Sequence, residues 1–145
     1  MPEPLSLGMK QRLFVHLIGK LINYVYELGY ELSDGESYRS DEQAIINALG
    51  YQGRHDLCNY LEQNFKYHGL ALTIDNNGKS NGILMSNHRI RLAKDFSLFK
   101  DGKYLTRTED WTIIGEWWEK LHPLCRWGGR FNDGNHFSLE HEGRR

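Results

Sequence analysis

Residues 86–105 read SNHRIRLAKDFSLFKDGKYL, and their pattern predicts a β-hairpin. Leu92–Phe99 is mostly apolar and is typical of a strand. Lys100–Lys103 contains an Asp-Gly pair, which favours a tight turn, and Tyr104 begins the returning strand. Two strands joined in this way pair antiparallel, so we expect an antiparallel sheet in this half of the chain.

Helical spacing dominates the residues before this hairpin. Lys10–Leu28 has apolar residues at the spacing of an amphipathic helix, and Gly29 is a stop signal for it. Two shorter helices are predicted at Asp41–Leu49, with Ser40 or Asp41 as its N-cap, and at Arg54–Tyr67. Between the first two helices, Tyr30–Arg39 is predicted to be a short strand or an extended loop.

Turn formers and a further helix complete the pattern. Asp75–Gly82 is expected to be a surface loop. Thr106 and Glu109 have the spacing of a capping box for a helix that continues through Trp117 and Trp118. These two tryptophans are expected to pack in the interior, because adjacent helical positions cannot both face one cleft. Helices come first and hairpins later, so the predicted fold class is α+β, an antiparallel sheet packed against several helices.

The composition fits one folded domain over residues 1–145, with 39% hydrophobic and 26% charged residues. A net charge of −1 provides no basic field for nucleic acid. The apolar runs are too short for a membrane span, and residues 1–7 lack the basic and apolar regions of a signal peptide. Cys58 and Cys125 cannot form a disulfide scaffold, and we expect inert thiols in a reducing cytosol.

Two histidines have neighbours that suggest metal binding. His88 comes just before the predicted strand, and Asp95 is an acid inside it that needs a partner or a metal if it is buried. His136 follows the turn at Asn132–Asn135 and begins another extended segment. Two histidines and one aspartate, without cysteine, form the ligand set of a catalytic zinc site with an open fourth position.

Asp133 precedes His136 by three residues, close enough to act as the general base for a water at such a site. The same residues also have a simpler interpretation, in which 132–135 is only a surface turn and His88 only a loop residue. The spacing by itself leaves both interpretations open.

Four separated motifs extend the zinc-site pattern over most of the chain. They are Ser37–Ser40 with its arginine, Ser86–His88, Ala93–Asp95 and Asp133–His136. In this order they resemble the signature of the zinc peptidases that cut peptidoglycan stem peptides. That family contains D-alanyl-D-alanine carboxypeptidases and dipeptidases, and phage endolysins that cleave L-alanyl-D-glutamate bonds. The match extends from about Tyr38 to Leu139 and is most similar to the small single-domain endolysins.

The resemblance implies a fold and a role for each matched residue. The fold would be the α+β type of the D-alanyl-D-alanine peptidases and hedgehog-like domains, with one Zn²⁺ per chain. The roles would be His88, Asp95 and His136 as zinc ligands, Asp133 as catalytic base, Arg39 as the donor that holds the substrate's carbonyl or stabilises the oxyanion, and Ser86 and Gln43 as substrate contacts. From its place beside two glycines, Trp127 is expected to form a wall of the substrate groove. One departure concerns Arg91, where many relatives have glycine for a special backbone angle.

The implied function is hydrolysis of the L-alanyl-D-glutamate bond of the stem peptide by a monomer that lyses the bacterial cell wall. The enzyme would be made in the host bacterial cytoplasm and would act on the wall in the periplasm, without membrane insertion and without nucleic acid. A D,D-carboxypeptidase or dipeptidase is the alternative from the same chemistry. A zinc-stabilised wall-binding domain without turnover is a third possibility, and the presence of Asp133 and Arg39 argues against it, because a structural zinc site needs neither residue.

Overall fold

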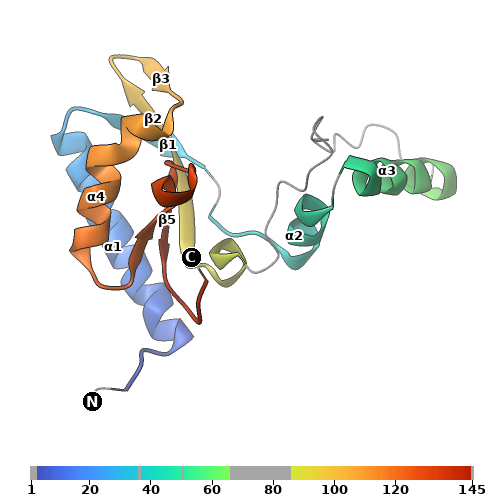
Figure 1. The fold of residues 1–145 in the computed structure, drawn as a ribbon, viewed down its shortest axis with the longest axis horizontal. Helices are drawn as coiled ribbons and strands as arrows, with labels where there is room; N and C mark the ends of the chain where they lie inside the picture. The colour runs from blue at the N-terminus through green and yellow to red at the C-terminus, as the bar shows by residue number, and fades with distance from the viewer. Residues whose placement is uncertain (1–2, 36, 50, 66–85, 145) are drawn as a thin grey trace. The chain divides into compact units, whose positions relative to one another are not determined.

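A computed structural model describes residues 3–35, 37–49, 51–65 and 86–144 (Figure 1). The chain divides into two compact units, Met1–Arg39 with Ser86–Arg145, and Ser40–Met85. One catalytic domain over residues 1–145 therefore stays a prediction. Within the described ranges, no helix combines the length and the apolar character that crossing a membrane requires.

The first unit contains an antiparallel sheet, as predicted. Its strands are β1 (Glu31–Asp34), β2 (Ala93–Lys100), β3 (Lys103–Leu105), β4 (Cys125–Trp127) and β5 (His136–Leu139). The order is β1-β2-β5-β4, with β3 pairing to β2 as the second strand of the hairpin. Asp101 and Gly102 form its turn with φ of 52° and 76°, the positive values that a tight hairpin turn requires. The hairpin prediction is confirmed.

Helix α1 (Leu7–Glu27) matches the long predicted helix. Ser6 accepts a hydrogen bond from the Met9 N–H at 3.3 Å and so caps its start. Gly29, with φ of 87°, allows the left-handed turn that ends the helix, because glycine has no Cβ to clash there.

Helix α4 (Thr112–Leu121) follows the short 3-10 turn η2 (Thr108–Trp111). The predicted capping pair was wrong by one residue at each position. The Asp110 carboxylate accepts the Arg107 N–H at 3.1 Å, and the Asp110 N–H donates to the Arg107 carbonyl at 3.1 Å. The helical backbone therefore starts one residue later than Thr106 and Glu109 imply.

The core lies between these two helices and the sheet. Figure 1 shows α1 and α4 together along the strands, and both helices contact them. Trp118 is fully buried against Phe14 and Phe137, with edge-to-face ring contacts at 6.2 and 5.9 Å. Trp117 stacks on the Tyr24 ring at 4.2 Å, so both tryptophans pack as expected. The fold is a mixture of helices and an antiparallel sheet, which confirms the predicted class.

The second unit contains α2 (Asp41–Ala48) and α3 (Tyr51–Phe65). The Ser40 hydroxyl accepts the Gln43 N–H at 3.1 Å, so Ser40 caps α2 as predicted. The predicted loop at Asp75–Gly82 lies outside the described residues.

Candidate metal centre

His88 lies in a 3-10 turn, η1 (Asn87–Ile90), that precedes β2. The Ser86 hydroxyl accepts the His88 N–H at 3.2 Å and caps this turn. The buried Asn87 amide donates to the Leu139 carbonyl at 2.8 Å, which attaches the turn to β5. The bend expected before the strand is therefore a capped turn held against the sheet.

Arg91 ends this turn in the left-handed conformation, with φ of 57° and ψ of 36°. This is the backbone angle that glycine supplies most easily, so the turn keeps its shape without a glycine. The Arg91 guanidinium lies 4.5 Å from the centre of the Tyr38 ring, a cation–π contact that offsets part of the backbone strain. The local bend is therefore present with arginine at this position.

Strand pairing brings Asp95 and His136 together, since they are direct partners in the antiparallel register of β2 and β5. Asp95 Oδ1 lies 3.1 Å from His136 Nδ1 and 3.4 Å from His88 Nε2. One carboxylate oxygen is thus shared by two imidazole nitrogens. The three side chains offer ligand atoms that all lie within 4.8 Å of one another.

The donor set fits a zinc ion. The His88 Nδ1–H donates to the Ser37 carbonyl at 3.0 Å, which turns Nε2 toward Asp95. His136 turns its Nδ1 toward the same carboxylate, and its buried Nε2 has no hydrogen-bond partner among the described residues. Two nitrogens and one oxygen without sulfur suit the ligand preferences of a catalytic zinc site.

The Asp95 carboxylate is ionised at neutral pH. Burial acts to raise its pKa, but hydrogen bonds from His136 and His88, with their positive charges, outweigh burial and lower the pKa to about 2. A carboxylate in this state is ready to bind a cation without first releasing a proton.

Asp133 stands beside this group on the loop after the 3-10 turn η3 (Gly128–Phe131). Its Oδ2 lies 4.0 Å from His136 Nδ1, and 48% of its side chain is exposed. Burial raises the Asp133 pKa, with a smaller contribution from the charge of Asp95, against the opposing charges of His136, His88 and Arg39. A carboxylate with a raised pKa, open to solvent beside the ligands, is suited to accept a proton.

The Asp133 loop is held by close backbone contacts at Gly128. The Asp133 N–H donates to the Gly128 carbonyl at 2.9 Å, and the His136 N–H donates to the Asp133 carbonyl at 3.1 Å. A Cβ at Gly128 would lie 2.2 Å from the Asp133 carbonyl oxygen, so only glycine fits there.

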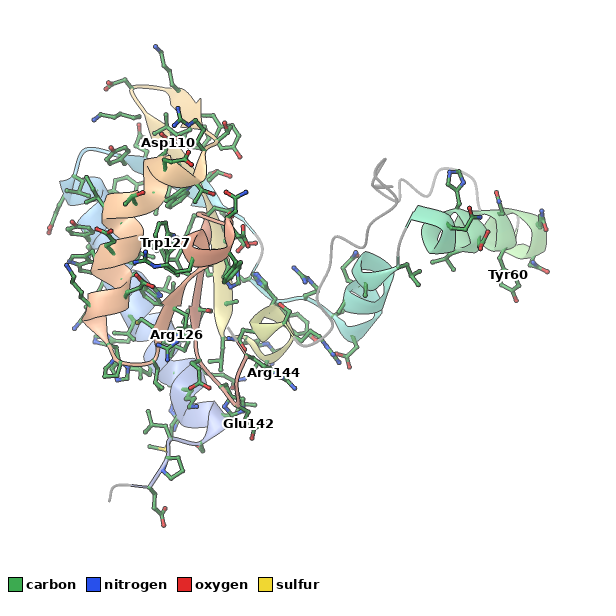
Figure 2. All side chains as sticks on the ribbon, in the orientation of Figure 1. Tyr60, Asp110, Arg126, Trp127, Glu142 and Arg144 are labelled. Carbon is green, nitrogen blue, oxygen red and sulfur yellow. The ribbon has the colours of Figure 1, made fainter. Side chains whose placement is uncertain are left out.

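Trp127 lies beneath α4 (Figure 2) and is only 4% exposed. Its indole N–H donates to the Gly134 carbonyl at 2.7 Å, next to Asp133. The contact is possible because Gly115 of α4 has no side chain where it meets the indole ring. Trp127 thus supports the Asp133 loop from the core, and its predicted contact with a substrate stays a prediction.

Arg39 donates its backbone N–H to the His88 carbonyl at 3.1 Å, and its charge acts on Asp133 as described above. Ser86 is buried and caps the His88 turn. Gln43 lies in α2, in the second unit. The structure thus places Arg39 and Ser86 near the three candidate ligands and Asp133, while the roles of Gln43, Ser86 and Arg39 toward a substrate stay predictions.

A pocket of about 170 Å³ adjoins Asp133 on the side of β3 and η2. Its walls are largely polar side chains and backbone from two segments, residues 104–108 and 132–135, and its remaining lining residues are Phe96 and Trp111. The pocket offers space for a polar group next to the predicted base. Sequence spacing gave no sign of this pocket, since its two segments meet only in the folded chain.

No family model matches the chain, and no curated protein matches it. One solved structure to which the chain is similar is a mutant of the vancomycin-resistance D,D-pentapeptidase VanY from a VanB-type resistance cassette, in complex with Zn(II). It is 15% identical, with a TM-score of 0.46, and the alignment covers 87% of this chain and 70% of that chain. A likeness of this size assigns no activity to the protein.

Proposed function

We propose that the protein is a zinc-dependent peptidoglycan peptidase that hydrolyses the L-alanyl-D-glutamate bond of the stem peptide. The observation behind this proposal is the meeting of His88, Asp95 and His136, whose ligand atoms lie within 4.8 Å of one another, with the Asp133 carboxylate 4.0 Å from His136. The sequence motifs that match this peptidase family are the same residues.

The metal would be held by His88, Asp95 and His136. Zinc bound in this way supplies Lewis acidity, which activates water as a nucleophile and polarises the scissile carbonyl. Asp133 accepts the proton of the attacking water at its carboxylate and then donates it to the leaving amine. The Arg39 guanidinium donates hydrogen bonds to the oxyanion of the tetrahedral intermediate, where a planar cationic donor is effective.

Asp133 and Arg39 also favour catalysis over a purely structural zinc site. A structural site needs four protein ligands and no base, whereas three protein ligands leave one position open. The half-exposed carboxylate of Asp133 lies outside the group of three ligand residues yet next to it. This arrangement supports a hydrolytic role over a structural one.

The proposed substrate is the stem peptide of the bacterial cell wall. We propose that the enzyme is a monomer. We propose that it is made in the host cytoplasm and acts on the wall in the periplasm. The polar pocket beside Asp133 gives room for substrate residues on one side of the bond that is cut. An endopeptidase needs such room on both sides, whereas a D,D-carboxypeptidase needs a closed site for a terminal carboxylate. The carboxypeptidase is the second candidate, and the fragments released from peptidoglycan distinguish the two.

The test is a digest of purified Gram-negative peptidoglycan by the full chain, with zinc or with a chelator, followed by mass spectrometry of the released fragments. Stem peptides that begin at D-glutamate, released only with zinc, would support the proposal. Loss of only a terminal D-alanine would favour the carboxypeptidase. A zinc-loaded protein that releases nothing would refute both activities. The matched control is the Asp133→Ala variant, since any fragments that it releases would come from contaminating hydrolases.

A further inference from the structure

The segment Ser37–Arg39 lies against the turn that contains His88. The Ser37 carbonyl accepts the His88 Nδ1–H at 3.0 Å, and the Arg39 N–H donates to the His88 carbonyl at 3.1 Å. The orientation of the His88 imidazole therefore depends on where the Ser37 carbonyl is held.

Lys94 holds Ser37 in place. Its Nζ lies 2.7 Å from the Ser37 hydroxyl oxygen and 2.7 Å from Asp34 Oδ1, and its side chain is only 14% exposed. The ammonium also lies 5.3 Å from the centre of the Phe96 ring. Lys94 thus links β2 to the end of β1 and to the segment that follows it.

The ion pair between Lys94 and Asp34 contributes little to the stability of the fold by itself. The Asp34 side chain is 84% exposed, and ion pairs with a solvent-exposed partner contribute little stability. The second contact of the mostly buried Lys94 side chain is more specific. It joins the ammonium to the hydroxyl of Ser37, the residue whose carbonyl accepts the His88 Nδ1–H.

We propose that Lys94 is a positioning residue of the metal centre, a role that rests on the zinc site of the proposed function. Its ammonium fixes Ser37, the Ser37 carbonyl holds the proton of His88 on Nδ1, and His88 Nε2 is thereby presented to the ion. Lys94 acts from the other face of β2, because neighbouring residues of a strand point to opposite sides and Asp95 follows it directly. Groups that bond directly to a ligating histidine, as the Ser37 carbonyl does, typically change metal affinity by about 10–100-fold when they are removed.

The decisive variant is Lys94→Met, which keeps the packing of the stem and removes the ammonium. Lys100→Met is the matched control, since Lys100 lies on the same strand and its Nζ contacts only the Tyr30 ring, at 4.8 Å, among the interactions described for it. Zinc affinity is measured on each full chain by competition with a chelating dye. We expect Lys94→Met to bind zinc at least about 10-fold more weakly and Lys100→Met to match the unmodified chain.

A second measurement needs no metal, and it distinguishes an effect on the orientation of the His88 imidazole from a general loss of protein stability. In the metal-free chain, ¹⁵N NMR of the imidazoles reports whether the proton of His88 lies on Nδ1. We expect the Nδ1–H form in the unmodified chain and in Lys100→Met, and a mixture of tautomers in Lys94→Met. A loss of stability alone would leave the tautomer unchanged.

Ser37→Ala removes only the hydroxyl that Lys94 binds and leaves the carbonyl, so it provides a milder second variant. We expect it to weaken zinc binding, and we expect its effect and that of Lys94→Met not to add, because both break the same link. Wild-type zinc affinity and a wild-type His88 tautomer in Lys94→Met and Ser37→Ala would overturn the proposal. A chain that binds zinc but cuts no peptidoglycan would refute the proposed function alone.

Discussion

A methyl group added at Gly128 tests how tightly the Asp133 loop packs against the candidate metal ligands. In Gly128→Ala the new Cβ would lie 2.2 Å from the Asp133 carbonyl oxygen and 2.7 Å from the Cβ of His136. Neither neighbour is the flexible end of a side chain, so the backbone must move. Overpacking of this kind costs about 1–3 kcal/mol, which corresponds to a melting temperature about 2–12 °C lower in a chain of this size.

Gly19→Ala is the matched control, because Gly19 lies inside α1 and nothing lies within 4 Å of its added Cβ. Alanine in a helix interior is favoured over glycine by about 1 kcal/mol, so this variant should melt about 2–4 °C higher. The assay is thermal unfolding by circular dichroism, with chelator and with zinc. We expect zinc to stabilise Gly19→Ala as it stabilises the unmodified chain, and to stabilise Gly128→Ala less because His136 is displaced. A Gly128→Ala chain with unchanged melting and an unchanged zinc response would refute this account of the loop.

Three further predictions concern single side chains. Asp133→Ala should keep zinc and fold but lose hydrolysis by about 10²–10⁴-fold, since general-base catalysis contributes that much; turnover near the wild-type rate would show that Asp133 is not the base. In the metal-free chain, the folded pKa of Asp95, about 2, lies below the unfolded value of about 4, so its contribution to stability is present above pH 4 and is lost as the pH falls toward 2. Urea unfolding at a series of pH values should show this loss, and Asp95→Asn should remove that part of the pH dependence. Burial raises the pKa of the Cys125 thiol to about 12, so iodoacetamide at pH 8 should leave Cys125 unmodified in the folded chain and label it in urea, as peptide mass spectrometry would report.

The elements that local sequence determines were predictable. The apolar spacing of α1 and the Asp-Gly turn of the β2–β3 hairpin depend on residues close together in the chain, and both predictions are confirmed. The start of α4 was harder to predict from the sequence, because Thr106–Glu109 and Arg107–Asp110 have the same spacing. Only the path of the backbone decides which pair forms the cap.

The candidate ligand residues could be selected from the sequence by their chemistry, since histidine and aspartate without cysteine suit zinc, and their roles as ligands stay a prediction. Their meeting depends on strand register, in which Asp95 pairs with His136, and the sequence alone does not state that register. The contacts that support the candidate site join residues that are even farther apart in the sequence. Lys94 and Ser37 lie 57 residues apart, and Trp127 fits beneath α4 only because Gly115 lies opposite its ring.

The central claim is that zinc binds at His88, Asp95 and His136. The most direct test is a crystal structure of the zinc-loaded chain, with anomalous difference maps on both sides of the zinc absorption edge. We expect one zinc peak per chain, at about 2.0–2.2 Å from a nitrogen of each histidine and from an oxygen of Asp95. A zinc peak bound by other residues, or no peak in a chain loaded with zinc, would contradict the account.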